Sequence, residues 1–308
     1  MWHLSHSPAP SEDDAHDGRA IVNALSVDVE EHFQVQSLEK AYARSQWDQY
    51  PSRVERNTRA LLEIFDVAGV KATFFTLGWV GERQPGLIRA IVEAGHELAS
   101  HGYCHARVDS QSAEQFRADI RRTKAILEDA GGMAVRGYRA ATFSVGPNTP
   151  WAWPVLEEEG YTYSSSVYPV MRDFYAFPDA PRTPYRPQGT RTLLEIPIAT
   201  LRFRDKNWPC GGGGYFRLLP YGITRAALTR LNRRDRQAAV FYIHPWEVDP
   251  GQPRVEGISA KSRFRHYTNL SRTADRLRRL TGDFRWGRMD QVFFGKGETT
   301  GHGRDVTA

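Results

Sequence analysis

The feature that most constrains the fold is an alternation of short apolar, β-prone segments with helical segments. Strands are predicted over residues 23–29, 71–77, 97–100, 135–139, 161–167, 193–198 and 238–243. Helices are predicted over residues 53–68, 85–94, 112–130, 149–159, 221–233 and 269–280. Strands that alternate with helices favour a mainly parallel sheet, closed or nearly closed into a barrel. We therefore predict an α/β fold, a distorted (β/α)7-type barrel with a short helical C-terminal extension.

Reactive side chains gather where the predicted strands end. These residues are Asp28, Glu30, His101, Arg139 and His244. In a parallel α/β barrel, the carboxyl ends of the strands meet at one face, and active sites are built there. The sequence therefore predicts that these five side chains share one site.

Two of these segments have the composition of a metal site. Asp28 and Glu30 are two positions apart at a strand end, so their side chains face the same side. His101 and His105 are four positions apart and share one face if the turn between them is helical, where two neutral imidazoles can bind one divalent metal. Taken alone, such a histidine pair is more often a pair of surface or core residues than of metal ligands, and Asp28 alone could be a helix or turn cap.

The ordered set of motifs resembles the NodB-type polysaccharide deacetylases, a carbohydrate esterase group. The resemblance covers roughly residues 23–250. It rests on Ser-Val-Asp-Val-Glu at 26–30, His-Gly-Tyr-Cys-His at 101–105, Gly-Tyr-Arg-Ala-Ala-Thr-Phe at 137–143 and Tyr-Ile-His-Pro-Trp at 242–246. The branch associated with exosortase and exopolysaccharide loci is similar in further segments. These are Gly-Gly-Tyr-Phe-Arg-Leu-Leu-Pro-Tyr at 213–221, Phe-Arg-His-Tyr-Thr-Asn-Leu at 264–270 and Phe-Arg-Trp-Gly-Arg-Met at 284–289.

The resemblance implies a role for each strand-end residue. Glu30, His101 and His105 would hold one divalent metal, with zinc as the first expectation and cobalt or nickel as alternatives. Asp28 would act as the general base, His244 as the general acid, and Arg139 would pair with Asp28. A backbone N–H near residues 142–143 could help to stabilise an oxyanion. The substrate-binding candidates are Phe143, Tyr215 and Trp246, for which core packing is the alternative.

The chain departs from the family pattern at three places. Glu30 stands where Asp is usual, and the Arg139 motif continues with Ala-Ala-Thr-Phe instead of two prolines and an aromatic residue. The segment expected to supply an Asp that orients the acid histidine holds only serines, at 164–166. Either another group replaces this Asp, with Glu195 as the candidate, or His244 is less well oriented.

The composition of the chain argues against several other classes of protein. No apolar run reaches 18 residues, and residues 1–19 lack a signal-peptide core, so we expect a cytoplasmic protein, with the inner membrane face as an alternative. The net charge of +5 comes without the interleaved aromatic pattern of a strong nucleic-acid binder, and two cysteines make no disulfide framework. The expected organisation is a disordered tail at 1–20, a catalytic domain at 21–250, an extension packed on the barrel at 251–295 and a disordered tail at 296–308.

The resulting functional hypothesis is a metal-dependent hydrolase that removes N-acetyl groups from amino sugars of a bacterial exopolysaccharide or its precursor. An N-acetylated oligo- or polysaccharide would be the substrate, and exopolysaccharide assembly machinery a candidate partner. Two alternatives stay open at this point. One is a small-molecule amidohydrolase of the same fold, and the other is a catalytically silent glycan-binding or assembly protein.

Overall fold

The central element of the fold is the strand β1 (Val22–Val29), whose residues from Asn23 onward are buried. The computed structural model describes residues 21–171 and 177–295. Three strands pair with β1, and all three run parallel to it: β2 (Thr73–Thr76), β9 (Val240–Ile243) and β10 (Arg285–Gly287). A strand with parallel neighbours on both edges is a near-continuous run of apolar residues in sequence. The first strand could therefore be predicted from the sequence.

The remaining strands continue the sheet away from β1 in the order β2, β3, β4, β5, β6. Their bounds are β3 (Glu97–Ser100), β4 (Gly137–Tyr138), β5 (Tyr163–Ser164) and β6 (Leu194–Glu195). Every pair in this sheet is parallel. The gap between β6 and β9 is bridged by the Ala199 N–H, which donates to the Val240 carbonyl at 3.2 Å. The predicted α/β barrel is thus confirmed as a curled, incompletely closed sheet.

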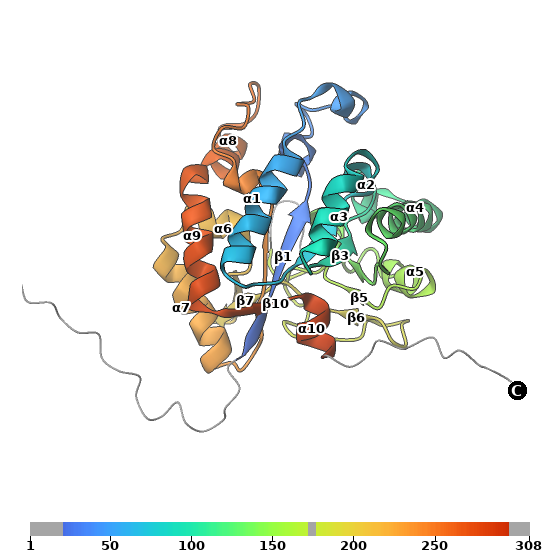
Figure 1. Ribbon diagram of the computed structural model, residues 1–308. Helices are drawn as coiled ribbons and strands as arrows, with labels where there is room; N and C mark the ends of the chain where they lie inside the picture. The colour runs from blue at the N-terminus through green and yellow to red at the C-terminus, as the bar shows by residue number, and fades with distance from the viewer. Residues whose placement is uncertain (1–20, 172–176, 296–308) are drawn as a thin grey trace, which may run out of the picture.

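Helices cover the sheet as two groups on either side of β1 (Figure 1). The first group comprises α1 (Val54–Val67), α6 (Gly213–Leu218), α7 (Tyr221–Arg233) and α9 (Leu270–Asp283). The second comprises α2 (Gly78–Arg83), α3 (Pro85–Glu93), α4 (Ala113–Gly131) and α5 (Ala152–Glu158). A capping box precedes α4, because Ser112 and Gln115 each accept the other's backbone N–H. No helix within the described residues is both long and apolar enough to span a bilayer.

The fifth and sixth strands are shorter than predicted. The prediction of a strand over 161–167 is wrong beyond Ser164, because the N–H groups of Ser166 and Val167 donate to the Glu195 carboxylate instead of extending the ladder. A hairpin of β7 (Thr200–Phe203) and β8 (Lys206–Pro209) follows β6 and is absent from the sequence prediction.

The glycine run at 211–214 is not a flexible turn, since α6 begins within it. A Cβ on Gly211 would lie 2.4 Å from the Val240 carbonyl, and one on Gly213 would lie 2.1 Å from Glu247 Oε1. These two glycines are therefore required by close packing.

The C-terminal segment is part of the sheet as well as a layer on it. It contains α8 (Ala260–Tyr267), α9, β10 and α10 (Met289–Phe294). Since β10 pairs with β1, the last strand among the described residues lies beside the first. The tails predicted to be disordered, 1–20 and 296–308, lie outside the described residues.

Candidate metal centre and active site

Glu30, His101 and His105 converge at one edge of the sheet. In the register of the sheet, Val29 pairs with Thr76 and Thr76 with Ser100, so Glu30 and His101 leave their strands at the same level. One ligand atom from each of the three side chains lies within 4.8 Å of the others, and all three residues are buried. The structure therefore brings together a carboxylate and two imidazoles, a donor set that divalent metals accept.

The two imidazoles meet without the helical turn considered from the sequence. The backbone bends after β3, with Gly102 at φ +73° and His105 at φ +52°, and the ring centroids lie 5.2 Å apart. Burial lowers the pKa of His101, and it is the largest of several causes that lower the pKa of His105 well below its usual value. Both rings are therefore neutral at physiological pH, the form that binds a metal.

The tautomer of His101 is fixed by its surroundings. Its Nδ1 lies 2.8 Å from the carbonyl oxygen of Arg139, which can only accept, so the neutral ring carries its proton on Nδ1. The lone pair of Nε2 is then left for the metal site. Metal-binding histidines are usually held in this way by a backbone carbonyl or carboxylate.

Glu30 is a buried carboxylate with few partners. Its Oε1 accepts a hydrogen bond from Trp246 Nε1 at 3.2 Å, while Oε2 has no hydrogen-bond donor among the described residues. That Oε2 lies 3.0 Å from Nε2 of the neutral His105. Burial raises the pKa of Glu30 to about 7, against the lowering effects of His244 and Trp246. A cation between the carboxylate and the imidazoles would satisfy these atoms, so the residues present fit a divalent metal.

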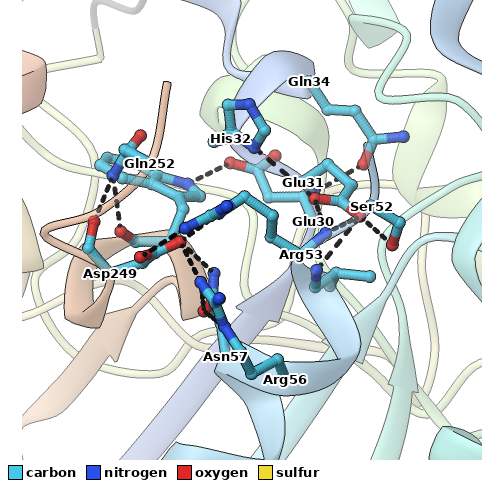
Figure 2. A network of polar contacts seen from close by, with 12 residues as sticks. Glu30, Glu31, His32, Gln34, Ser52, Arg53, Arg56, Asn57, Asp249 and Gln252 are labelled. Carbon is cyan, nitrogen blue, oxygen red and sulfur yellow. Dashed lines mark hydrogen bonds and ion pairs between the residues drawn. The ribbon is translucent and has the colours of Figure 1, made fainter. Parts of the chain in front are cut away.

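A network behind Glu30 fixes the segment that follows β9 against α1 (Figure 2). The Glu31 carboxylate accepts hydrogen bonds from the Ser52 hydroxyl and from backbone N–H groups at the start of α1. Asp249 accepts from Arg53 Nε at 2.6 Å and from Arg56 Nη2 at 2.9 Å. The start of α1 and the segment that contains Asp249, which are about 200 positions apart in sequence, are thereby held together near Glu30.

Asp28 and Arg139 form a buried pair beside the metal donors. Arg139 Nη1 donates to Asp28 Oδ1 at 2.6 Å and to Ser26 Oγ at 2.8 Å. The same guanidinium donates to the carbonyl and the hydroxyl of Ser165 and lies 4.0 Å from the centre of the Phe75 ring. Because every direction of the guanidinium is engaged, Arg139 fixes the orientation of Asp28.

The carboxylate that holds His244 is Glu247, which the sequence reasoning missed. Glu247 Oε1 lies 2.7 Å from His244 Nδ1, and Glu247 Oε2 accepts from Arg217 Nε at 2.6 Å. Burial would raise the pKa of Glu247, but Arg217 and His244 lower it to about 2. Burial would lower the pKa of His244, but Glu247, Glu30 and Asp28 raise it to about 9.

The expectation for Glu195 is wrong. Its carboxylate accepts hydrogen bonds from Trp153 Nε1, Ser166 N and Val167 N. A local signal for Glu247 was present in His-Pro-Trp-Glu at 244–247. Proline at the first position of a short helix, with Glu three residues after the cap, is the pattern in which the Glu side chain turns back to the cap.

A cavity of about 210 Å³ opens over these side chains. Its lining includes the site residues Asp28, Glu30, His101, His105 and His244, together with Val35, Gln36, Ser37, Ala140, Thr142, Phe143, Tyr242 and Arg265. Thr142 Oγ1 is buried without a hydrogen-bond partner among the described residues, whereas the Phe143 N–H already donates to the Ala140 carbonyl. The Thr142 hydroxyl is thus the better oxyanion donor of the two.

The three substrate-binding candidates are placed differently. Phe143 lines the cavity, and Tyr215, on α6, does not. Trp246 is 5% exposed, with its ring between the imidazoles of His244 and His266 at centroid distances of 5.0 and 4.4 Å. Both faces of the indole are therefore covered, which leaves no platform for a sugar.

Comparisons with known proteins agree with this architecture. Residues 37–164 match the family model described as polysaccharide deacetylase, and residues 165–294 match a domain of unknown function, DUF3473. A crystal structure of a candidate polysaccharide deacetylase from Mycobacterium smegmatis superposes with a TM-score of 0.59 at 21% identity, covering 94% of this chain and 93% of that one. The fold and the strand-end histidines thus define a carbohydrate esterase type of α/β half-barrel. Residues 37–164 thus match the polysaccharide deacetylase family.

Two curated relatives align with part of the chain. The peptidoglycan deacetylase-like protein FGM2 of Gibberella zeae is 31% identical over 109 residues, which are 35% of this chain and 31% of the relative. A peptidoglycan-N-acetylglucosamine deacetylase of Bacillus cereus is 32% identical over 82 residues, which are 27% of this chain and 30% of the relative. The aligned part is thus less than a third of either relative.

Proposed function

We propose that this chain is a metal-dependent hydrolase that removes N-acetyl groups from amino sugars, with a bacterial exopolysaccharide or its precursor as the substrate. The bond cleaved is an amide other than a peptide bond. The observation that carries the proposal is the presence of three metal donors, a fixed aspartate and a carboxylate-bound histidine around one cavity. The curated relatives named as peptidoglycan deacetylases support N-acetylated glycans as the substrate class.

Glu30, His101 and His105 would hold the metal, zinc first and cobalt or nickel as alternatives. When bound, such an ion polarises the amide carbonyl and lowers the pKa of water. Three protein donors leave a coordination position open, as a catalytic site requires.

The chain's own residues would carry the proton transfers. Asp28, aimed by Arg139, would take a proton from the attacking water. His244 Nε2 lies 4.0 Å from Asp28 Oδ2 and 3.6 Å from Glu30 Oε1, so it faces the same reacting group and would protonate the leaving amine. Thr142 Oγ1 would donate to the oxyanion.

Glu247 and Arg217 would be positioning residues for this acid. Glu247 binds His244 at Nδ1 and so directs Nε2 toward the cavity. Arg217, 2% exposed, also donates to the backbone carbonyls of His266, Thr268 and Arg265. The orientation of His244 would therefore depend on the junction between α8 and α9.

Acetate release from N-acetylated chitooligosaccharides, measured with and without a chelator, tests the proposal. We expect release that a chelator abolishes, that added zinc restores, and that Asp28→Asn removes while the metal stays bound. A parallel assay on an N-acetylated exopolysaccharide and on peptidoglycan tests the substrate. Turnover of a small amide that survives chelation would favour the amidohydrolase alternative. Glycan binding without turnover, unchanged in Asp28→Asn, would favour a silent binding protein.

A further inference from the structure

The positive charge of the chain is concentrated in two segments, residues 200–239 and 261–289. Residues 200–239 contain nine Lys and Arg and two Asp, a net charge of +7. Residues 261–289 also contain nine Lys and Arg and two Asp, so the remaining residues of the chain, whose net charge is +5, together carry −9. The charge of residues 200–239 is not explained by the catalytic site, because of the cations in this segment only Arg217 contacts it. A basic region that the catalytic site does not use indicates an anionic partner.

The β7–β8 hairpin presents aromatic side chains beside these cations. Leu201 pairs with Trp208 and Phe203 with Lys206, so these four side chains lie on one face. Leu201 packs against the core, but Phe203 is 47% and Trp208 56% exposed. The turn residues Arg204 and Asp205 both have positive φ, in a position where Asn-Gly is usual. Charged residues thus occupy the tip.

Helix α7 continues the same surface. Arg230 Nη2 donates to the carbonyl oxygen of Arg202 at 3.3 Å, which places the helix against the hairpin. Ile223 of α7 is 51% exposed. We call the set Phe203, Arg204, Lys206, Trp208, Ile223 and Arg230 the hairpin patch.

The hairpin patch lies away from the catalytic edge. Ala199, just before β7, bonds to Val240 at the start of β9, whereas His244 follows the end of β9. In Figure 1, α7 lies at the lower end of the molecule and α8, beside the catalytic edge, at the upper end. A large partner could therefore cover the patch and leave the cavity open.

We propose that the hairpin patch docks on a membrane surface that contains anionic phospholipids. Exposed Trp and Phe side chains flanked by Lys and Arg are typical of segments that lie in the bilayer interface, where the rings enter the headgroup region and the cations meet lipid phosphates. An acidic polysaccharide would match the charge, but Phe203 offers it no hydrogen bond. Docking would keep the enzyme at a membrane with its cavity facing away from the lipid. This inference does not depend on the proposed activity.

Vesicle co-sedimentation of the full chain tests the docking. We expect binding to vesicles of equal parts phosphatidylglycerol and phosphatidylcholine, weakening with added salt, and at least about tenfold weaker binding to phosphatidylcholine alone. The Phe203→Ser, Trp208→Ser double variant should bind roughly tenfold more weakly. The matched control is Phe264→Ser, which removes a ring that is 61% exposed on α8 and should bind like the unmodified chain.

Charge-reversal variants distinguish an effect of the hairpin patch from an effect of net charge. Arg204→Glu with Lys206→Glu should abolish most vesicle binding, whereas Lys40→Glu with Arg89→Glu makes the same change in net charge elsewhere and should have little effect. Equal losses in the two variants would overturn the proposal.

Two further measurements do not depend on the folding of a variant. Brominated lipids should quench more fluorescence in the unmodified chain than in Trp208→Phe, and equal quenching would contradict insertion of the hairpin. Absence of vesicle binding by the unmodified chain, or salt-sensitive binding to an acidic polysaccharide instead of vesicles, would also overturn the proposal.

Discussion

The two halves of the chain each place a buried glutamate in the site, and the two glutamates are in opposite states. Glu30, from the first half, has one hydrogen-bond donor and an oxygen without any among the described residues, and its pKa is raised to about 7. Glu247, from the second half, is enclosed by Arg217 and His244, and its pKa is lowered to about 2. Both are 2% exposed or less.

The difference separates two uses of a buried carboxylate. A buried charge without partners is costly, so Glu30 is poised to receive a cation. A buried charge with full partners is a fixed point, so Glu247 can orient a neighbour. In the proposed mechanism, the region matched to DUF3473 would therefore supply the positioned acid, while residues 30–105 would supply the metal donors.

The first way to break this comparison is Glu30→Gln, for which we expect the largest effect. An amide keeps the shape of the side chain but removes the anionic donor, so metal content should fall and acetate release should drop by at least about 10³-fold. Metal analysis of the purified protein and initial rates measure the two effects. Asp28→Asn is the control, because it should lose turnover and keep the metal. Full metal content in Glu30→Gln would remove Glu30 from the site.

Glu247→Gln tests the positioning role. We expect kcat to fall about tenfold to a hundredfold with KM and metal content nearly unchanged, because His244 loses its anionic partner. NMR of the imidazole should show the Nδ1–H of His244 in the unmodified chain and its loss or exchange in the variant. Glu247→Asp should recover part of kcat. The matched control is Glu195→Gln, a buried glutamate that does not contact His244. An equal loss of kcat in both variants would make Glu247 merely structural.

Gly213→Ala tests whether the glycine run is needed for the close packing of α6 against Glu247. The added methyl would lie 2.1 Å from Glu247 Oε1, so we expect a loss of about 2–3 kcal/mol in the free energy of unfolding, with reduced kcat. Gly214→Ala is the matched control in the next residue of α6, where a Cβ meets no atom within 4 Å. It should be neutral or slightly stabilising, because alanine favours helix. Denaturant unfolding of both variants measures the contrast, and equal stabilities would contradict it.

The comparison of the two halves also shows what the sequence could and could not predict. Helix α7 begins and ends where the periodicity predicts, and Glu30 and His101 could be picked out as candidates because each follows an apolar strand. Glu247 was missed because the expected carboxylate was sought in a different segment, although it stands three residues after His244. The hairpin was missed because its turn, Arg204-Asp205, lacks the Asn-Gly signal. The close packing around the glycine run could not be predicted, because the sequence does not reveal which atoms approach a backbone.

Another buried glutamate, Glu97, lies at the contact between the two halves of the chain, and its substitution has the smallest expected effect. It accepts hydrogen bonds from Thr73 Oγ1, Tyr163 Oη and the Asp290 N–H, and burial, with help from Asp290, raises its pKa to about 7. A carboxyl whose pKa is higher in the folded than in the unfolded chain loses stabilising free energy as pH rises from about 4.5 to 7. Glu97→Gln cannot ionise, so its decline in stability between pH 5 and 8 should be smaller by about 1–2 kcal/mol. Denaturant unfolding at both pH values measures this difference, and Glu93→Gln, at an exposed position, is the control. Equal declines in stability in Glu97→Gln and in the unmodified chain would show that Glu97 does not couple pH to the contact between α10 and β3.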